Sequence, residues 1–258
     1  MRFNQPRSLS TRGNYDDYPA LFLGSRSTTR LLTRIASEEP VPATDLIDNQ
    51  LSSISTYRAI RHAERSGILI AFSQITGSNK SKVQKYLCLN HGLQINREIA
   101  DTLSTIALTT GASERLDNAS LVSQENRLTA AFELDLDSLF GSRTRTMAVI
   151  IVALARFLDF STIARMVGVQ LNGNLHSLLT PLVRGRVLQK RACGRLVLYA
   201  LADEPWRVPL RRLCLRLAEI SPRLTTLARL AEEIRDSGDS PPRKYLRDLK
   251  PSLLREFE

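Results

Sequence analysis

The chain has 258 residues, of which 43% are hydrophobic and 6% aromatic, and its formal net charge is +10. This hydrophobic content is enough for a folded core and excludes a disordered chain, and the few aromatic residues argue against a stacking platform for single-stranded nucleic acid. The positive charge indicates a polyanionic partner, either nucleic acid or an acidic membrane surface.

Residues 1–22 are polar and are expected to form a flexible basic arm. Gly13 and Pro19 disfavour regular structure here. The arm either lies along DNA or is simply solvated, and its positive charge comes from Arg2, Arg7 and Arg12.

Residues 23–90 are predicted to form three helices followed by a β-hairpin. Apolar residues recur at helical spacing from Ser27 until the prolines of Glu-Glu-Pro-Val-Pro (38–42) end the first helix. A short second helix is expected over 43–50, with Thr44 as its N-cap. A third begins at Ser52 or Ser53 and stops at Gly67, with an apolar face made of Ile54, Tyr57, Ile60 and Ala63. Two strand-like segments, 68–75 and 83–89, then flank a polar loop and predict the hairpin.

Residues 91–139 are expected to form an acidic helical connector. An amphipathic helix is predicted over 93–110, then a loop, and then a second helical or extended segment over 125–140. Glu133, Asp135 and Asp137 alternate in this segment, but neither a histidine nor a glycine-rich loop accompanies them. We interpret them as part of an acidic linker and not as a metal site.

Residues 140–203 are predicted to form a second unit of the same kind. A long helix is expected over 142–159 and a short helix over 160–169, opened by Ser161 and closed by a turn at Gly168. A third helix follows from Gln170, and Pro181 is expected to bend or break it at a cost of roughly 3 kcal/mol. Strands 186–191 and 195–201 flank a short wing at 192–194. The inward residues would be Ile163, Ala164, Val167, Leu171, Leu175, Leu178, Leu179 and Leu182.

Residues 204–236 are predicted to be C-terminal helices, followed by a basic tail over 237–258. A leucine-rich stripe runs along these helices at three-to-four spacing. It either packs over the second unit as core or forms a homodimer interface. The stripe comprises Leu210, Leu213, Leu217, Ile220, Leu224, Leu227, Leu230 and Ile234.

The two units repeat one pattern. Gly-Ser-Arg followed by a Thr/Arg pair and an apolar run begins at Gly24 and again at Gly141, 117 residues later. Charge follows the repeat: residues 1–90 hold 12 Lys and Arg against 7 Asp and Glu, residues 91–139 hold 3 against 8, and residues 140–258 hold 21 against 11. Both units are therefore basic and the connector is acidic. A generally basic protein from an arginine-rich proteome is the simpler alternative.

The order helix, helix, helix, strand, loop, strand resembles that of winged helix-turn-helix units, and the segment STYRAIRHAERSGILI is similar to the third helix and first strand of many winged-helix regulators. FSTIARMVGV resembles the helix and turn of bacterial regulators. The resemblance implies a mainly α protein with small β-hairpin wings (α+β): two winged-helix units joined by a helical connector. Among winged-helix regulators the pattern looks closest to the MarR-like or ArsR-like groups, although this chain is longer than the members of either group.

In such units the exposed start of the third helix reads base edges in the major groove, and the hairpin tip reaches the phosphate backbone or the minor groove. The resemblance therefore assigns DNA contacts in the first unit to Ser53, Ser55, Thr56, Arg58 and His62. In the second unit it assigns them to Gln170, Asn172, Asn174, His176 and Ser177. The basic residues in and after the first wing are Lys80, Lys82 and Lys85. Those around the second wing are Arg186, Lys190, Arg191 and Arg195.

Enzyme motifs and cofactor motifs are not found. The three cysteines, Cys88, Cys193 and Cys214, form no CxxC pair, and the three histidines have no ligand spacing. No phosphate-binding loop, nucleophile elbow or dinucleotide fingerprint occurs. The start of the chain has no apolar core of a signal peptide, and the longest apolar run, 147–155, is too short to span a membrane. We expect a cytoplasmic, nucleoid-associated protein without a cofactor and without membrane contact.

The resulting prediction is a sequence-specific binder of double-stranded DNA, most simply a transcriptional regulator. One alternative is a plasmid-type replication initiator or segregation protein, which would bind repeated origin sites. A second alternative is an adaptor in which winged-helix units dock other proteins.

Overall fold

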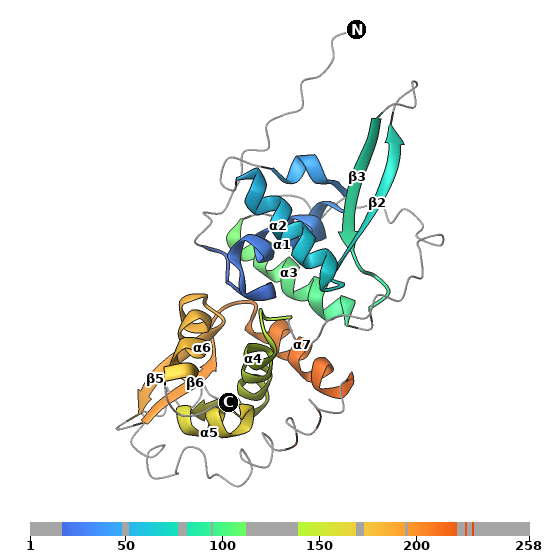
Figure 1. Cartoon of the computed structure of the whole chain (residues 1–258). Helices are drawn as coiled ribbons and strands as arrows, with labels where there is room; N and C mark the ends of the chain where they lie inside the picture. Colours follow the sequence, from blue (N-terminus) through green and yellow to red (C-terminus); the bar gives the residue numbers. More distant parts are fainter. Residues whose placement is uncertain are drawn as a thin grey trace.

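The computed structural model describes residues 17–47, 52–76, 82–93, 95–111, 139–168, 173–193 and 196–220, together with 225 and 229. These residues form two halves, each built from helices beside a small antiparallel sheet (Figure 1). The predicted mainly helical α+β class is confirmed. Residues 1–16, most of the connector and most of the C-terminal segment beyond Ile220 lie outside the described residues.

The two halves have the same order of elements. After a short 3-10 turn, η2 (Phe22–Gly24), the first half contains α1 (Arg26–Glu38), β1 (Val41–Pro42), the 3-10 turn η3 (Ala43–Leu46), α2 (Ser53–Arg65), β2 (Leu69–Thr76), β3 (Lys82–Leu89) and α3 (Asn96–Thr110). The second half contains α4 (Arg143–Ala155), β4 (Phe157–Asp159), α5 (Phe160–Val167), α6 (Gly173–Arg184), β5 (Leu188–Cys193), β6 (Leu196–Leu201) and α7 (Arg207–Ile220).

The sheets also match. Their strand orders are β1-β3-β2 and β4-β6-β5, so in each half the short first strand pairs with the last strand of the hairpin. Equivalent tyrosines occupy this pairing, because Pro42 lies opposite Tyr86 and Leu158 lies opposite Tyr199. The hairpin of each half is thereby tied to the connection that leaves its first helix.

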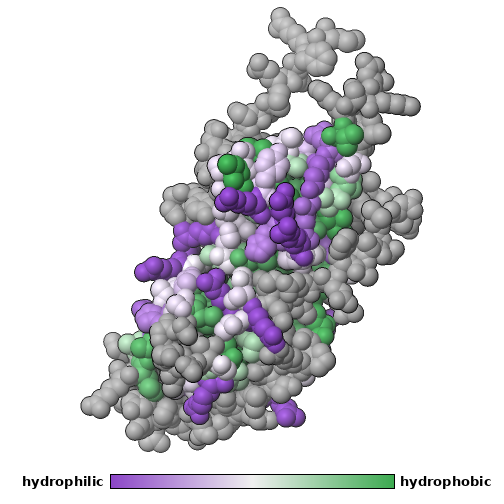
Figure 2. Space-filling model, in the orientation of Figure 1, coloured by the Kyte–Doolittle hydropathy of each residue, from purple (hydrophilic) through white to green (hydrophobic). Residues whose placement is uncertain are grey.

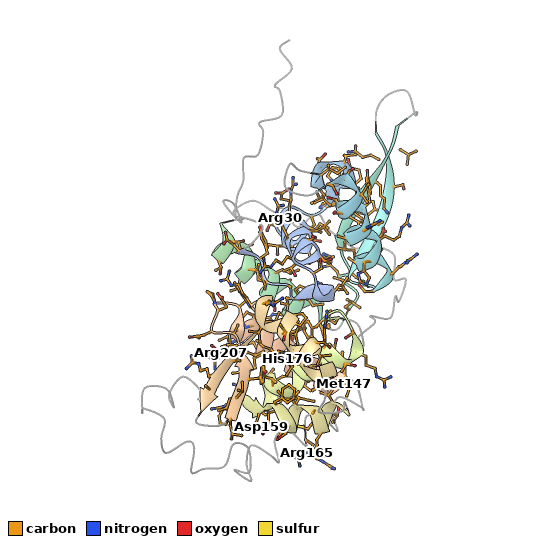
Figure 3. All side chains as sticks on the ribbon, turned by 60° about the vertical axis from the view of Figure 1, so that its left-hand side comes forward. Arg30, Met147, Asp159, Arg165, His176 and Arg207 are labelled. Carbon is orange, nitrogen blue, oxygen red and sulfur yellow. The ribbon has the colours of Figure 1, made fainter. Side chains whose placement is uncertain are left out.

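The repeated Gly-Ser-Arg segment begins the first helix of each half. The Ser25 hydroxyl accepts a hydrogen bond from the Thr28 amide, and the Ser142 hydroxyl accepts one from the Arg145 amide. A serine at this place satisfies an amide that the helix itself leaves without a partner. Arg30 and Met147, both labelled in Figure 3, hold the seventh position of the motif in their halves. Both are buried.

Three predicted boundaries were wrong. The helix expected over 142–159 ends at Ala155, because Arg156 adopts a left-handed φ of 68° and the next three residues pair with β6. The cap of α5 is Asp159, whose carboxylate accepts from the Ser161 and Thr162 amides, and not Ser161. The helix expected over 43–50 is described only as the short 3-10 turn η3, which follows Pro42.

Two other expectations about helices also need correction. Pro181 lies inside α6 without ending it, and the helix continues to Arg184; the proline falls near the C-terminal end, where few turns depend on it. Ile54 and Tyr57, assigned to the apolar face of the third helix, are 63% and 50% exposed.

The two halves share one hydrophobic core. Leu32 and Ile35 of α1, Ile150 of α4 and Leu213 of α7 all belong to it and are fully buried. Three members of the leucine-rich stripe, Leu210, Leu213 and Leu217, lie in this core. The members of the stripe from Leu224 onward are outside the described residues. None of the described helices combines the length and the apolar character needed to cross a bilayer.

Candidate nucleic-acid interface

Helix α2 has one buried and one exposed side. Its start is fixed by Ser52, whose hydroxyl accepts from the Ser55 amide. Thr56, Ala59, Ile60 and Ala63 recur at three-to-four spacing and are buried. The opposite side is exposed and carries Ser53, Ile54, Tyr57, Arg58, Arg61, His62 and Arg65.

Hydrophilic side chains gather over α2 on the face shown in Figure 2. Arg58, Arg61 and Arg65 supply three positive charges at helical spacing, with Tyr57 and Ile54 beside them near the start of the helix. Guanidinium groups can bind phosphates or the O6 and N7 atoms of guanine, and exposed apolar groups can contact thymine methyl groups. We call these five residues the α2 face.

The structure places the predicted residues of the first unit unequally. Ser53, Arg58 and His62 are exposed, and Ser55 is half-buried with its hydroxyl 2.9 Å from that of Ser52. Thr56 was wrongly included, because it is fully buried and its hydroxyl donates to the Ser52 carbonyl at 3.2 Å.

Sequence reasoning missed Arg61 and Arg65, and it misassigned Ile54 and Tyr57. A signal was available: positions 54, 57, 58, 61 and 65 share one side of any helix that starts at Ser53. The apolar character of Ile54 and Tyr57 was taken as evidence of burial, whereas burial of Thr56 and Ala59 turns that side to solvent.

In the first hairpin, Lys85 is exposed but ion-paired with Glu64 of α2 at 2.6 Å. It therefore also fastens β3 to α2, next to a stacked pair formed by Phe72 and Tyr86 with ring centroids 5.7 Å apart. Lys80 lies outside the described residues, and Lys82 begins β3 without a described side chain.

In the second half, α6 holds the position that corresponds to α2. His176, labelled in Figure 3, and Ser177 are exposed on it. The His176 Nδ1 lies 2.6 Å from the Thr180 hydroxyl. Asn174 belongs to the first turn of α6, but its side chain is outside the description, as are residues Gln170 and Asn172.

Of the basic residues around the second wing, Lys190 is exposed and Arg191 is half-buried, both on β5; Arg195 lies outside the described residues. Arg186 does not flank the wing tip. It precedes β5, at the opposite end of the hairpin, with its Nη2 2.6 Å from the Glu204 carboxylate and its guanidinium 5.4 Å from the Trp206 ring centroid. Its Nη1 also donates to the Asp17 carbonyl at 3.0 Å. This arginine has a structural role.

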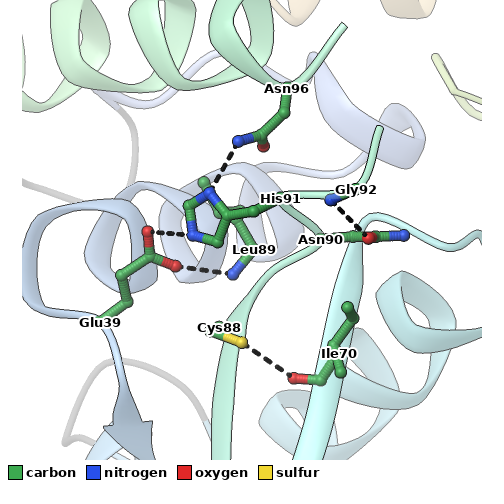
Figure 4. Close-up of polar contacts among 8 residues, drawn as sticks. All are labelled: Glu39, Ile70, Cys88, Leu89, Asn90, His91, Gly92 and Asn96. Carbon is green, nitrogen blue, oxygen red and sulfur yellow. Dashed lines mark hydrogen bonds and ion pairs between the residues drawn. The ribbon is translucent and has the colours of Figure 1, made fainter. Parts of the chain in front are cut away.

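A polar chain joins α1, β3 and α3 in the first half (Figure 4). The Glu39 carboxylate accepts from the Leu89 amide at 2.7 Å and lies 2.8 Å from the His91 Nε2, while the His91 Nδ1 lies 2.8 Å from the Asn96 amide nitrogen. The neighbouring Cys88 thiol is buried and directed to the Ile70 carbonyl instead. We interpret these linked polar contacts as structural, because they hold α1, β3 and α3 together.

Within the described residues, no group of three or more His, Cys, Asp or Glu side chains is placed to hold a metal ion. Glu133, Asp135 and Asp137 lie outside those residues.

Comparison of the chain with protein-family models, with curated proteins and with solved structures found no match. The candidate site therefore rests on the geometry of the chain itself.

Proposed function

We propose that the chain is a sequence-specific double-stranded DNA-binding protein of winged-helix type, acting as a transcriptional regulator. The support is that each half places three helical segments before its hairpin, the second being the 3-10 turn η3 in the first half and α5 in the second, and that the last of the three is exposed on one side. In winged-helix proteins this third helix enters the major groove.

The observation that carries the proposal is the α2 face. Arg58, Arg61 and Arg65 are exposed on one side of a helix whose other side is buried. Such a helix can enter a groove without unfolding, and its arginines would then lie against phosphates and base edges. The net charge of +10 adds a sequence-independent attraction to the polyanion.

The test begins with duplexes enriched from a random-sequence pool by the purified protein. Fluorescence anisotropy then compares the enriched duplex with a shuffled one over a salt series. We expect Arg58→Ala to weaken binding to the enriched duplex by about 1–3 kcal/mol and binding to the shuffled duplex much less.

The matched control is Arg212→Ala, which removes the same charge from an exposed position of α7. It is expected to leave the preference for the enriched duplex unchanged. Equal losses for the two variants, or failure of the pool to yield any preferred duplex, would refute sequence-specific binding through α2.

A further inference from the structure

The two halves meet through equivalent residues. Gly24 and Gly141 occupy the same position in the repeated motif, and their backbones touch: a Cβ on Gly141 would lie 2.9 Å from both the N and the Cα of Gly24. A Cβ on Gly24 would lie 3.3 Å from the Gly141 Cα. The Leu23 amide beside this contact donates to the Leu139 carbonyl at 2.8 Å.

The same holds at the level of elements. Helices α3 and α7, which close the first and second halves, pack against each other. Arg216, toward the C-terminal end of α7, forms an ion pair at 3.3 Å with Glu98 in the first turn of α3. Such a pair is expected where two equivalent helices cross in opposite directions. Next to the glycines, the Phe22 and Phe140 rings lie 6.4 Å apart.

Contact between equivalent residues is diagnostic of the symmetry. In a two-fold arrangement the same patch of each unit meets itself, whereas units related by translation join the back of one to the front of the next. The contacts of Gly24 with Gly141 and of α3 with α7 are of the first kind. These contacts point to an approximate two-fold rotation between the two halves.

The relative position of the halves is held by further backbone contacts. The Ala20 amide donates to the Gly185 carbonyl at 2.8 Å, and the Arg26 guanidinium donates to the Arg184 carbonyl at 3.1 Å. Both carbonyls lie at the end of α6, so the first half directly fixes the helix that corresponds to α2. With the shared core, these contacts hold α2 and α6 at one separation.

Resting on the proposed function, we infer that a single chain reads two unlike half-sites arranged as an inverted pair on one duplex. The two-fold relation would present α2 and α6 to the duplex in opposite directions, as two subunits of a dimeric regulator do. The half-sites would differ in sequence, because α2 exposes Arg58, Arg61 and Tyr57 where α6 exposes His176 and Ser177.

The test maps four points of the bound protein along the enriched duplex. Single cysteines replace exposed residues on each reading helix and each hairpin, in a background where Cys193 is serine, and each carries a DNA-cleaving iron chelate. The variants are Ser53→Cys on α2, Val83→Cys on β3, Ser177→Cys on α6 and Val197→Cys on β6; Val83 and Val197 are 67% and 40% exposed.

An inverted arrangement predicts that the cleavage centres follow a mirror order along the duplex, either hairpin, helix, helix, hairpin or helix, hairpin, hairpin, helix. Native mass spectrometry should then show one chain per duplex. The order helix, hairpin, helix, hairpin would overturn the inference while leaving DNA binding intact. Cleavage from the α2 and β3 positions alone, or two chains per duplex, would also overturn it. Absence of any preferred duplex would instead refute the proposed function on which the inference depends.

Discussion

Thr56 and Tyr57 are neighbours in α2, but one is buried and the other is exposed. Thr56 is fully buried with its hydroxyl bonded to the Ser52 carbonyl, whereas Tyr57 is half exposed among the arginines of the α2 face. Substituting the two residues therefore separates stability from binding at adjacent positions.

We expect Tyr57→Ala to weaken binding to the enriched duplex several-fold while leaving the thermal unfolding temperature unchanged. Thr56→Ala should do the opposite and lower the free energy of unfolding by about 1–2 kcal/mol, through a lost methyl group and hydrogen bond. Anisotropy and urea unfolding measure the two effects. A destabilised Tyr57→Ala with normal binding would mean that this ring is structural.

Cys214 gives a prediction about pH. Burial raises the pKa of its thiol above the ordinary value of 9.0, so the folded state keeps the proton that the unfolded state releases. The contribution to stability is present below about pH 9 and is lost as the pH rises further. Burial raises the pKa of Tyr199 as well, which adds a loss in the same direction above about pH 10.

The free energy of unfolding is therefore expected to fall as the pH rises above about 9, and Cys214→Ala should make this fall shallower. Urea unfolding of both proteins at several pH values measures the slopes, and the slope is compared because the substitution itself removes buried volume. Identical slopes would show that the thiol ionises without cost in the fold.

At the scale of elements, Gly141 and Gly168 form a matched pair. Both have positive φ, at 99° and 75°, but a Cβ on Gly141 would meet the backbone of Gly24, whereas a Cβ on Gly168 would meet nothing within 4 Å. Gly168→Ala should cost about 1–2 kcal/mol from backbone strain alone.

Gly141→Ala adds a clash between backbones that cannot move aside as a side chain can, and it should cost roughly 3 kcal/mol or more. Urea unfolding of the two variants checks the difference. Equal costs would mean that the two halves separate easily at the glycine contact.

The sequence predicted those elements that have a strong local pattern. Both hairpins, the start of α2 at one of the two serines 52 and 53 and the turn at Gly168 follow from capping and turn chemistry that a few adjacent residues supply; the cap is Ser52. The strands β1 and β4 were missed because they have two or three residues and owe their existence to partners far along the chain.

The exposure of the candidate site residues was predicted only in part, for a similar reason. Arg58 and His62 were placed correctly on the exposed side of α2, but Thr56 was not, because the side that is buried is decided by packing and not by polarity. Arg186 was assigned to the wing from its charge alone; its carboxylate partner is 18 residues away and its aromatic partner is Trp206.

At the scale of the whole molecule, the shared core predicts cooperative unfolding of both halves. Trp206 is the only tryptophan, it lies in the second half, and it is buried, so its fluorescence reports on that half. Far-UV circular dichroism reports on helices of both. We expect the two signals to change at the same urea concentration.

The contrary result would be a loss of helical signal while Trp206 fluorescence stays native. That would show the first half unfolding alone, and Gly141→Ala is the variant in which such a separation would first be seen. The wild-type chain and this variant should be compared under the same conditions.

The hydrogen bond from the Leu23 amide to the Leu139 carbonyl joins the two halves within one polypeptide. This affects how the occupancy of a site depends on the concentration of the protein. A regulator assembled from two subunits dissociates on dilution, so its occupancy of a site falls with the square of its concentration. Here the pairing surfaces are permanently tethered, and their effective concentration does not depend on how much protein a cell makes. Under the proposed function, occupancy of a DNA site would then follow a simple hyperbola down to the lowest expression level.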